Sequence, residues 1–289
     1  MTTFFTTSGV RLSLRSQHPG PLNWLLLPGG PGIGSESLHE LADILDVPGS
    51  IWMVDLPGDG SNTSFPVPLQ QSWDGVSFPP SASHDPYAQW PQVLLEAATS
   101  LPNAVYVGHS TGGMYLLSVP ELEQHIAGLV LISSAPDASW HPHYVQMTKR
   151  HPLPEVDLAA KRYESEPTND NLRDLAVAST PWNFTPKGIA MGQDLLSRMP
   201  YNQDATVWSD QAFDHIYQAK WWPKTLPTLI LSGAEDRIVL QTLWNRPEFK
   251  QQNVIHQWIE DAGHFPWLEN PDGVQSAFSK LSTTLFLGK

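Results

Sequence analysis

Residues Val105 to Gly113 read V-Y-V-G-H-S-T-G-G, and this stretch decides the fold that we expect. Its β-branched and aromatic start is typical of a buried strand, and helix-compatible residues continue from Met114 to Ser118. Between them, the pattern G-x-S-x-G predicts a turn so tight that Ser110 has a strained backbone conformation. Glycines two positions on either side let the neighbouring backbone approach without a Cβ clash. Ser110 then presents its hydroxyl at a helix N-terminus, where partial positive charge favours an anion.

The composition is that of a globular chain of 289 residues with a formal net charge of −13. Acidic residues are spread along the chain without any basic run, which argues against nucleic acid or an anionic membrane as a partner. The absence of cysteine excludes disulfides, zinc–thiolate sites and a cysteine nucleophile. The first residues lack the features of a signal peptide, and no apolar run reaches membrane-spanning length. We therefore expect a soluble, cytoplasmic protein, and the sequence leaves its oligomeric state open.

Short apolar runs alternate with helical stretches, which predicts a mostly parallel sheet covered on both faces. Residues 137–222 interrupt this alternation with helical stretches, broken by prolines, and no strand-like run. We expect a core domain of residues 1–136 and 223–289, with 137–222 as a helical cap over the carboxyl ends of the strands. The expected strands lie at residues 3–7, 10–15, 23–27, 51–55, 105–107, 128–132, 229–232 and 254–259. The expected helices outside the cap lie at 35–45, 87–100, 114–118, 240–250 and 271–286, and residues 61–86 are expected to form a long surface loop.

A serine hydroxyl becomes a good nucleophile only when a base takes its proton, so Ser110 predicts a histidine and an acid farther along the chain. The strand L-I-L-S ends in G-A-E-D-R-I-V, and the strand V-I-H-Q-W-I ends in E-D-A-G-H-F-P. Both endings lie at the same edge of the sheet as Ser110, which predicts His264 as the base and Asp236 as its partner. Glu235 and Asp261 are the alternatives for the acid.

Two backbone N–H groups are also needed to stabilise a developing oxyanion. Thr111, at the start of the helix after the serine, is expected to supply one of them. The loop P-G-G-P-G at residues 28–32 is expected to supply the other, and its prolines have no N–H to donate. Gly30 is our first choice for this second donor and Gly29 our second.

Other residues have a weaker claim on function. We expect His109 to be packed away from the serine, and Asp55, a further alternative for the acid, to have a structural role. The histidines of the insertion (His141, His143 and His151) lack an accompanying pattern of carboxylates, so we expect neither a metal site nor a cofactor. Aromatic residues are expected to line an apolar pocket, namely Trp140, Trp182, Trp208 and Trp267.

With these motifs the chain resembles the α/β-hydrolase superfamily over nearly its whole length apart from the insertion. The loop P-G-G-P-G is similar to the H-G-G-P-G loop of the proline iminopeptidase branch, although Pro28 replaces the histidine and Thr111 the tryptophan usual after the nucleophile. The resemblance implies the α/β-hydrolase fold, with eight strands and a helical cap inserted after the strand that follows the serine turn. It also implies cap carboxylates that hold a substrate's amino terminus, for which the sequence offers Glu164, Glu166, Asp204, Asp210 and Asp214.

The sequence therefore predicts a cofactor-independent serine hydrolase acting on a small ester, amide or related acyl substrate, or on a short peptide. Ser110 attacks the carbonyl, His264 takes its proton and Asp236 holds the imidazole. Alternatives that share this triad are an aminopeptidase releasing N-terminal proline, a carbon–carbon bond hydrolase and an acyltransferase. The alternative outside enzymes is a ligand-binding receptor on the same fold.

Overall fold

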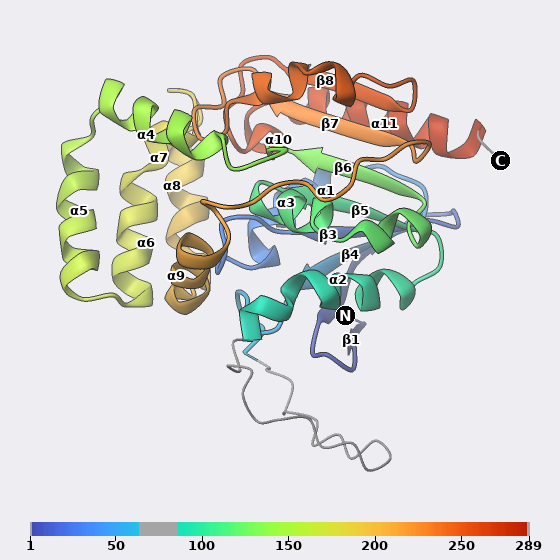
Figure 1. Cartoon of the computed structure of the whole chain (residues 1–289), viewed down its shortest axis with the longest axis horizontal. Coiled ribbons are helices and arrows are strands. Elements are labelled where there is room, and N and C mark those ends of the chain that lie inside the picture. The colour runs from blue at the N-terminus through green and yellow to red at the C-terminus, as the bar shows by residue number, and fades with distance from the viewer. Residues whose placement is uncertain (1, 64–85, 288–289) are drawn as a thin grey trace, which may run out of the picture.

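The computed structural model describes residues 2–63 and 86–287. Figure 1 shows a twisted sheet with helices on both faces and a separate group of helices, α4 to α9, beside one end of it. Most of the surface loop expected at residues 61–86 lies outside the described residues.

An eight-stranded sheet forms the centre of the described chain, with the strand order β1-β2-β4-β3-β5-β6-β7-β8. The pairs β1–β2 and β2–β4 are antiparallel, and every other neighbouring pair is parallel. This confirms the mostly parallel sheet that the sequence predicts, and β3, β6 and β8 begin and end at the predicted residues. The strands are β1 (Thr3–Phe5), β2 (Arg11–Gln17), β3 (Asn23–Leu27), β4 (Ser50–Asp55), β5 (Ala104–His109), β6 (Gly128–Ile132), β7 (Thr228–Gly233) and β8 (Val254–Ile259).

The sheet separates two hydrophobic layers, because successive side chains of a strand point to opposite faces. On β3, Leu25 and Leu27 pack with α2 and α3, whereas Trp24 and Leu26 pack with α1 and α11, and all four are fully buried. None of the helices in the described part of the chain is long and apolar enough to cross a bilayer. The core helices are η1 (Ser35–Leu38), α1 (His39–Ile44), η2 (Pro86–Gln89), α2 (Trp90–Thr99), α3 (Thr111–Leu117), η3 (Pro120–Gln124), α10 (Pro266–Glu269) and α11 (Pro271–Leu287).

The helix expected at residues 240–250 is the main difference from the sequence prediction. Two short 3-10 helices, η4 (Gln241–Asn245) and η5 (Pro247–Phe249), take its place. Pro247 has no N–H to continue a helix, and Arg246 before it is extended, with φ −67° and ψ 145°. An uninterrupted α-helix therefore cannot pass through this point.

The helical insertion, which we call the cap, lies between β6 and β7. Its two ends meet at its base, where Asp137 and Gln218 form a β-bridge and Ala138 N–H donates to the Tyr217 carbonyl (2.8 Å). Beyond this bridge Trp221 packs on the core, and its indole N–H donates to a carbonyl of α3 (2.8 Å). The division of the chain into core and cap domains at residues 137 and 222 stays a prediction. The cap helices are α4 (Trp140–Arg150), α5 (Pro154–Ser165), α6 (Asn169–Ala178), α7 (Thr180–Asn183), α8 (Ile189–Ser197) and α9 (Gln203–Ala212).

Candidate active site

Ser110 lies in a strained turn between β5 and α3. Its backbone has φ 49° and ψ −123°, a conformation that residues other than glycine rarely adopt. A Cβ at Gly108 would come within 2.6 Å of the backbone of Gly113, and one at Gly112 would overlap the carbonyl oxygen of Pro28. The close approach of three backbone segments therefore explains why glycines flank the serine.

Asp236 and His264 form a buried pair beside the same edge of the sheet. Asp236 follows β7, and His264 lies in the loop after β8, which we call the histidine loop (residues 260–265). The imidazole Nδ1 lies 3.1 Å from Oδ1 and 3.0 Å from Oδ2 of Asp236. The side chains are 5% and 0% exposed, for His264 and Asp236 respectively, so little water competes for this contact. With Nδ1–H donating to the carboxylate, Nε2 is the ring nitrogen left to accept a proton.

The carboxylate of Asp236 is itself held by neighbouring donors. The N–H groups of Ile238 and Val239 donate to Oδ1 (2.9 and 3.1 Å), and the side-chain amide of Gln241 donates to Oδ2 (3.1 Å). Gln241 is buried, and its carbonyl oxygen accepts from the Ser232 hydroxyl (2.7 Å). Gln241 was not predicted from the sequence, because its role depends on how η4 folds back onto the end of β7.

The alternative acids after β7 and β8 face elsewhere. The side chain of Glu235 is exposed, while its backbone N–H donates to the Ala262 carbonyl (2.9 Å). Asp261 is exposed as well and lies 3.9 Å from the ammonium group of Lys187. Of these three acids, Asp236 is the one whose carboxylate meets the imidazole.

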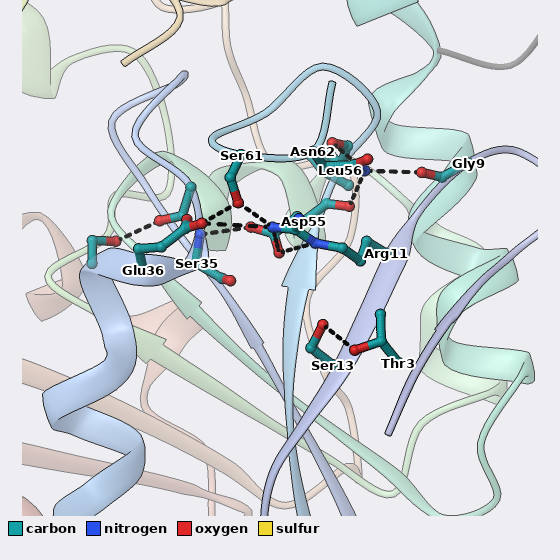
Figure 2. A network of polar contacts seen from close by, with 12 residues as sticks. Thr3, Gly9, Arg11, Ser13, Ser35, Glu36, Asp55, Leu56, Ser61 and Asn62 are labelled. Atoms are coloured by element: carbon teal, nitrogen blue, oxygen red, sulfur yellow. Dashed lines mark hydrogen bonds and ion pairs between the residues drawn. The ribbon is translucent and has the colours of Figure 1, made fainter. Parts of the chain in front are cut away.

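Asp55, the remaining alternative, belongs to a polar network at the end of β4 (Figure 2). Its carboxylate accepts from the Arg11 guanidinium (2.8 Å) and from the backbone N–H of Ser35 (2.7 Å). Burial raises the pKa of Asp55, the negative charge of Glu36 raises it further, and Arg11 opposes both. Ser61 bonds to both Arg11 and Glu36. The network thus fixes the start of η1, and Asp55 has the structural role expected of it.

Just before η1 lies the glycine loop (residues 28–34), which is held from two sides. On the core side, the N–H of Gly32 donates to Oδ1 of Asp59 (3.0 Å). On the cap side, the Asn202 N–H donates to the carbonyl of Gly32 (2.7 Å), and the Thr206 hydroxyl donates to the carbonyl of Pro31 (2.7 Å). Asp59 is fully buried, and burial together with the nearby charge of Asp55 raises its pKa to about 7.

The residues expected to donate N–H groups to an oxyanion lie in the glycine loop and at the start of α3. Thr111 is the first residue of α3, and the first N–H groups of a helix have no partner within the helix. Gly30 has φ +56° and lies on the cavity wall together with Thr111. Gly29 is packed on the serine turn, where a Cβ would come within 2.6 Å of the Cβ of Ser110. Their roles as oxyanion donors stay predictions, with Gly30 in the more suitable place.

A cavity of about 390 Å³ between core and cap collects the predicted site residues. Ser110 and His264 both line this cavity, and among the hydrogen bonds of the described residues none joins the Ser110 hydroxyl to His264. Bonds of this kind often become short only when substrate binds. The predicted site residues on the wall are Gly30, Ser110, Thr111, Trp140 and His264, with apolar surface from Ile33, Met114, Leu196, Ile238, Val239 and Phe265.

Of the four tryptophans expected at the pocket, only Trp140 is among the described residues that line this cavity. Trp267 is buried beneath it, edge-on to His109 with ring centroids 4.8 Å apart. Trp208 packs in an aromatic cluster of the core, and the indole N–H of Trp182 donates to a carbonyl within the cap (2.8 Å). Large aromatic rings gain much from burial, and Trp182 and Trp267 are buried while Trp208 is partly buried against the core.

His109 connects the serine turn to the histidine loop. Its Nε2–H donates to the backbone carbonyl of His264 (3.0 Å), and the two rings lie 4.9 Å apart. Burial lowers its pKa well below the ordinary value, and the neighbouring His264 lowers it further. The ring is therefore neutral at pH 7, and it packs between the serine turn and the histidine loop while also bordering the cavity.

Two of the five cap carboxylates singled out in the sequence line the cavity. Asp210 bonds to His215 (3.1 Å), and burial raises the pKa of Asp214 to about 6. His141 also lines the cavity and packs against His215 with ring centroids 4.2 Å apart. Among the described residues, no group of three or more histidine, aspartate or glutamate side chains is arranged to hold a metal ion. The carboxylates that do not line the cavity are Glu164, Glu166 and Asp204.

Comparisons with known proteins agree with this architecture. Residues 24–277 match the model of a family described as the alpha/beta hydrolase family. A pimeloyl-[acyl-carrier protein] methyl ester esterase from Xylella fastidiosa is 27% identical over 271 residues, which cover 90% of this chain and 95% of that protein. A proline iminopeptidase from Mycobacterium smegmatis (16% identity) and an esterase from Exiguobacterium antarcticum (17% identity) both superpose with a TM-score of 0.64 over 99% of each chain. At these identities the two solved structures establish the shared fold.

Proposed function

This chain belongs to the alpha/beta hydrolase family, and from that premise we propose that it is a serine hydrolase that cleaves small carboxylic esters through an acyl-enzyme. The distant relationship to a methyl ester esterase supports an ester as the substrate. The apolar wall of the cavity favours a small acyl or alkyl group next to the serine.

One observation carries the proposal. The imidazole of His264 is bonded through Nδ1 to a buried carboxylate, and it shares a cavity wall with a serine in a strained turn. A carboxylate that accepts from Nδ1–H fixes the tautomer in which Nε2 is a base. A structural serine needs neither a strained backbone nor a histidine held in this way.

The proposed reaction has two halves, and in each of them His264 first takes a proton and then returns it. Ser110 Oγ attacks the ester carbonyl as Nε2 of His264 takes its proton, and the N–H groups of Thr111 and Gly30 donate to the oxyanion. The C–O bond then breaks, and the alcohol leaves with the proton from His264. Water attacks the acyl-enzyme while His264 takes its proton. The bond between the acyl carbon and Ser110 Oγ then breaks, and His264 returns the proton to Oγ, which releases the carboxylic acid and restores Ser110.

The experiment that tests the proposal is the substitution Ser110→Ala, with hydrolysis of p-nitrophenyl acetate and covalent labelling by a fluorophosphonate as readouts. We expect labelling to disappear and kcat to fall by roughly a millionfold, as in other serine triads. The thermal unfolding midpoint should stay within a few degrees, because a small side chain is lost at the cavity wall. Ser197→Ala in the cap is the matched control, since Ser197 is exposed. Turnover or labelling that survives in Ser110→Ala would refute the covalent mechanism.

An aminopeptidase is the second candidate, and the position of Asp210 and Asp214 on the cavity wall favours it. Carboxylates at this place suit a substrate with a protonated amino terminus. Hydrolysis of a proline arylamide should be compared with that of the acyl ester in the wild type and in Asp214→Asn. A preference for the arylamide that Asp214→Asn abolishes would support the aminopeptidase, and arylamide turnover at the background rate would exclude it.

A further inference from the structure

The cap is bonded to the backbone of the histidine loop through the last residue of α7, Asn183. The backbone N–H of His264 donates to the carbonyl of Asn183 (2.8 Å). The rings of Phe184 and Phe265 stack beside this bond, with centroids 5.0 Å apart and an angle of 12° between their planes. A Cβ at Gly263 would overlap the carbonyl oxygen of Asn183. The approach of cap to loop is therefore a close backbone contact.

Glu269, the last residue of α10, lies between the same two segments. Its Oε1 accepts from the backbone N–H of Thr185 (2.9 Å) and from the hydroxyl of Thr185 (2.6 Å). Its Oε2 accepts from the backbone N–H of Gly263 (2.7 Å). A Cβ at Gly188 would overlap this carboxylate, so the cap backbone leaves room for it. One charged group thus joins the cap to the residue before His264 through three charge-assisted bonds.

We propose that Glu269 is a positioning residue, whose carboxylate locks the histidine loop to the cap and thereby holds the imidazole of His264 in place. This inference rests on the proposed function, in which His264 is the base. Asp236 holds the imidazole ring of His264 through Nδ1. The position of the ring also depends on the backbone of His264, which Asp236 does not hold. Glu269 and Asn183 fix two successive N–H groups of that backbone. The cap is then a part of the catalytic framework as well as a cover over the substrate.

A carboxylate is the group that this position requires, because both of its oxygens accept hydrogen bonds. In Glu269→Gln, one end of the side chain becomes an NH₂ group. That NH₂ group then faces either the donors of Thr185 or the N–H of Gly263. The hydrogen bonds on that side of Glu269 are lost. Glu269 is not among the described residues that line the cavity, so a direct effect on substrate binding is not expected.

The test measures the rate at which a fluorophosphonate labels Ser110, together with kcat and KM for p-nitrophenyl acetate. Glu269→Gln should reduce the labelling rate and kcat about tenfold, because small displacements of a catalytic group are costly, and should change KM by less than about twofold. Thr185→Val should reduce both rates about threefold, whereas Thr185→Ser keeps the hydroxyl and should restore them. The loss in Glu269→Gln/Thr185→Val should be smaller than the product of the single losses, because the two residues share one contact.

Glu260→Gln is the matched control, since it removes the same charge from an exposed residue at the start of the histidine loop. A second readout is the NMR signal of the Nδ1–H proton of His264, which we expect to broaden or shift in Glu269→Gln and to stay unchanged in Glu260→Gln.

Wild-type labelling in Glu269→Gln, a rise in KM with kcat unchanged, or an unaltered proton signal would each overturn the proposal. If Glu269→Gln does not fold, the two Thr185 variants test the same contact from the side of the cap. Failure of the proposed function is distinguishable, because the wild type would then not be labelled at Ser110, while the proton signal would still report on Glu269.

Discussion

The glycine loop and the histidine loop are held in similar ways, each between a carboxylate and the cap. In the first, Gly32 donates its N–H to Asp59 and accepts from the Asn202 N–H. In the second, Gly263 donates its N–H to Glu269, and the next N–H donates to the carbonyl of Asn183. Both loops thus take one restraint from a charged side chain and one from the cap backbone.

The two loops differ in how deeply the carboxylate that holds each of them is buried. Asp59 is fully buried, and burial raises its pKa to about 7, so its charge changes within the physiological range. Glu269 is only half-buried, and it bonds directly to the cap through Thr185. The glycine loop should therefore respond to pH and the histidine loop to the docking of the cap. The same arrangement of loop, carboxylate and cap should thus make one loop sensitive to pH and the other sensitive to the position of the cap.

Among the changes that test this comparison of the two loops, the largest effect is expected from Gly263→Ala, which pushes the histidine loop away from the cap. The new Cβ would overlap the carbonyl oxygen of Asn183, and the bond from the His264 N–H would break with it. Because His264, the proposed base, moves with the loop, kcat/KM for the acyl ester should fall about 100-fold. A loss of less than about threefold, measured in a protein with an unchanged circular dichroism spectrum, would mean that the cap contact does not hold the loop.

A smaller effect is expected from Gly32→Ala, the matched change in the other loop. Here the new Cβ would overlap the carbonyl oxygen of Asn202, and alanine is disfavoured at φ +92°. Removing an oxyanion donor outright typically costs about 10²–10³ in kcat, and a displaced Gly30 should cost about tenfold. Steady-state kinetics of both glycine variants would show whether the two loops differ in the expected order. A larger loss in Gly32→Ala than in Gly263→Ala would reverse the comparison.

The smallest effect on rate, and the one most dependent on pH, is expected from Asp59→Asn. Below pH 7 the wild-type carboxyl is protonated and resembles asparagine, so both proteins should label with fluorophosphonate at equal rates at pH 5. Above pH 7 the charged carboxylate binds the Gly32 N–H more strongly, and the wild type should be about threefold faster at pH 9. A ratio that is constant from pH 5 to pH 9 would rule out a pH-dependent glycine loop.

The same substitution should change the dependence of stability on pH. The folded-state pKa of Asp59 is raised, so the folded protein binds its proton more tightly than the unfolded chain does. The stabilisation by this group is fully present below about pH 4 and is lost as the pH rises to about 7. The free energy of unfolding of the wild type, measured relative to Asp59→Asn in urea, should therefore decrease between pH 4 and pH 7. An increase over this range would contradict the burial argument.

The sequence predicted the core more closely than the cap, and the reason is physical. Runs such as Gly128–Ile132 are apolar over the length of a strand, and a parallel sheet buried on both faces requires such runs. Glycine and proline mark the turns by their backbone restrictions, which act within a few residues. In the cap and in residues 240–250, helix-forming residues alternate with prolines that interrupt a helix. In residues 240–250, two short 3-10 helices form, and Pro247 begins the second of them.

By itself, the sequence determined the strained turn at Ser110, the parallel sheet around it and the loops that bring Asp236 and His264 to the same edge. These follow from local patterns and from the rule that parallel strands end together. Only the tertiary structure decided which acid contacts the imidazole and which of the four tryptophans reaches the cavity. It also decided that Gln241, Asp59 and Glu269 bond to Asp236, Gly32 and Gly263, respectively. Such contacts join segments far apart in the chain, and no local preference of the backbone encodes them.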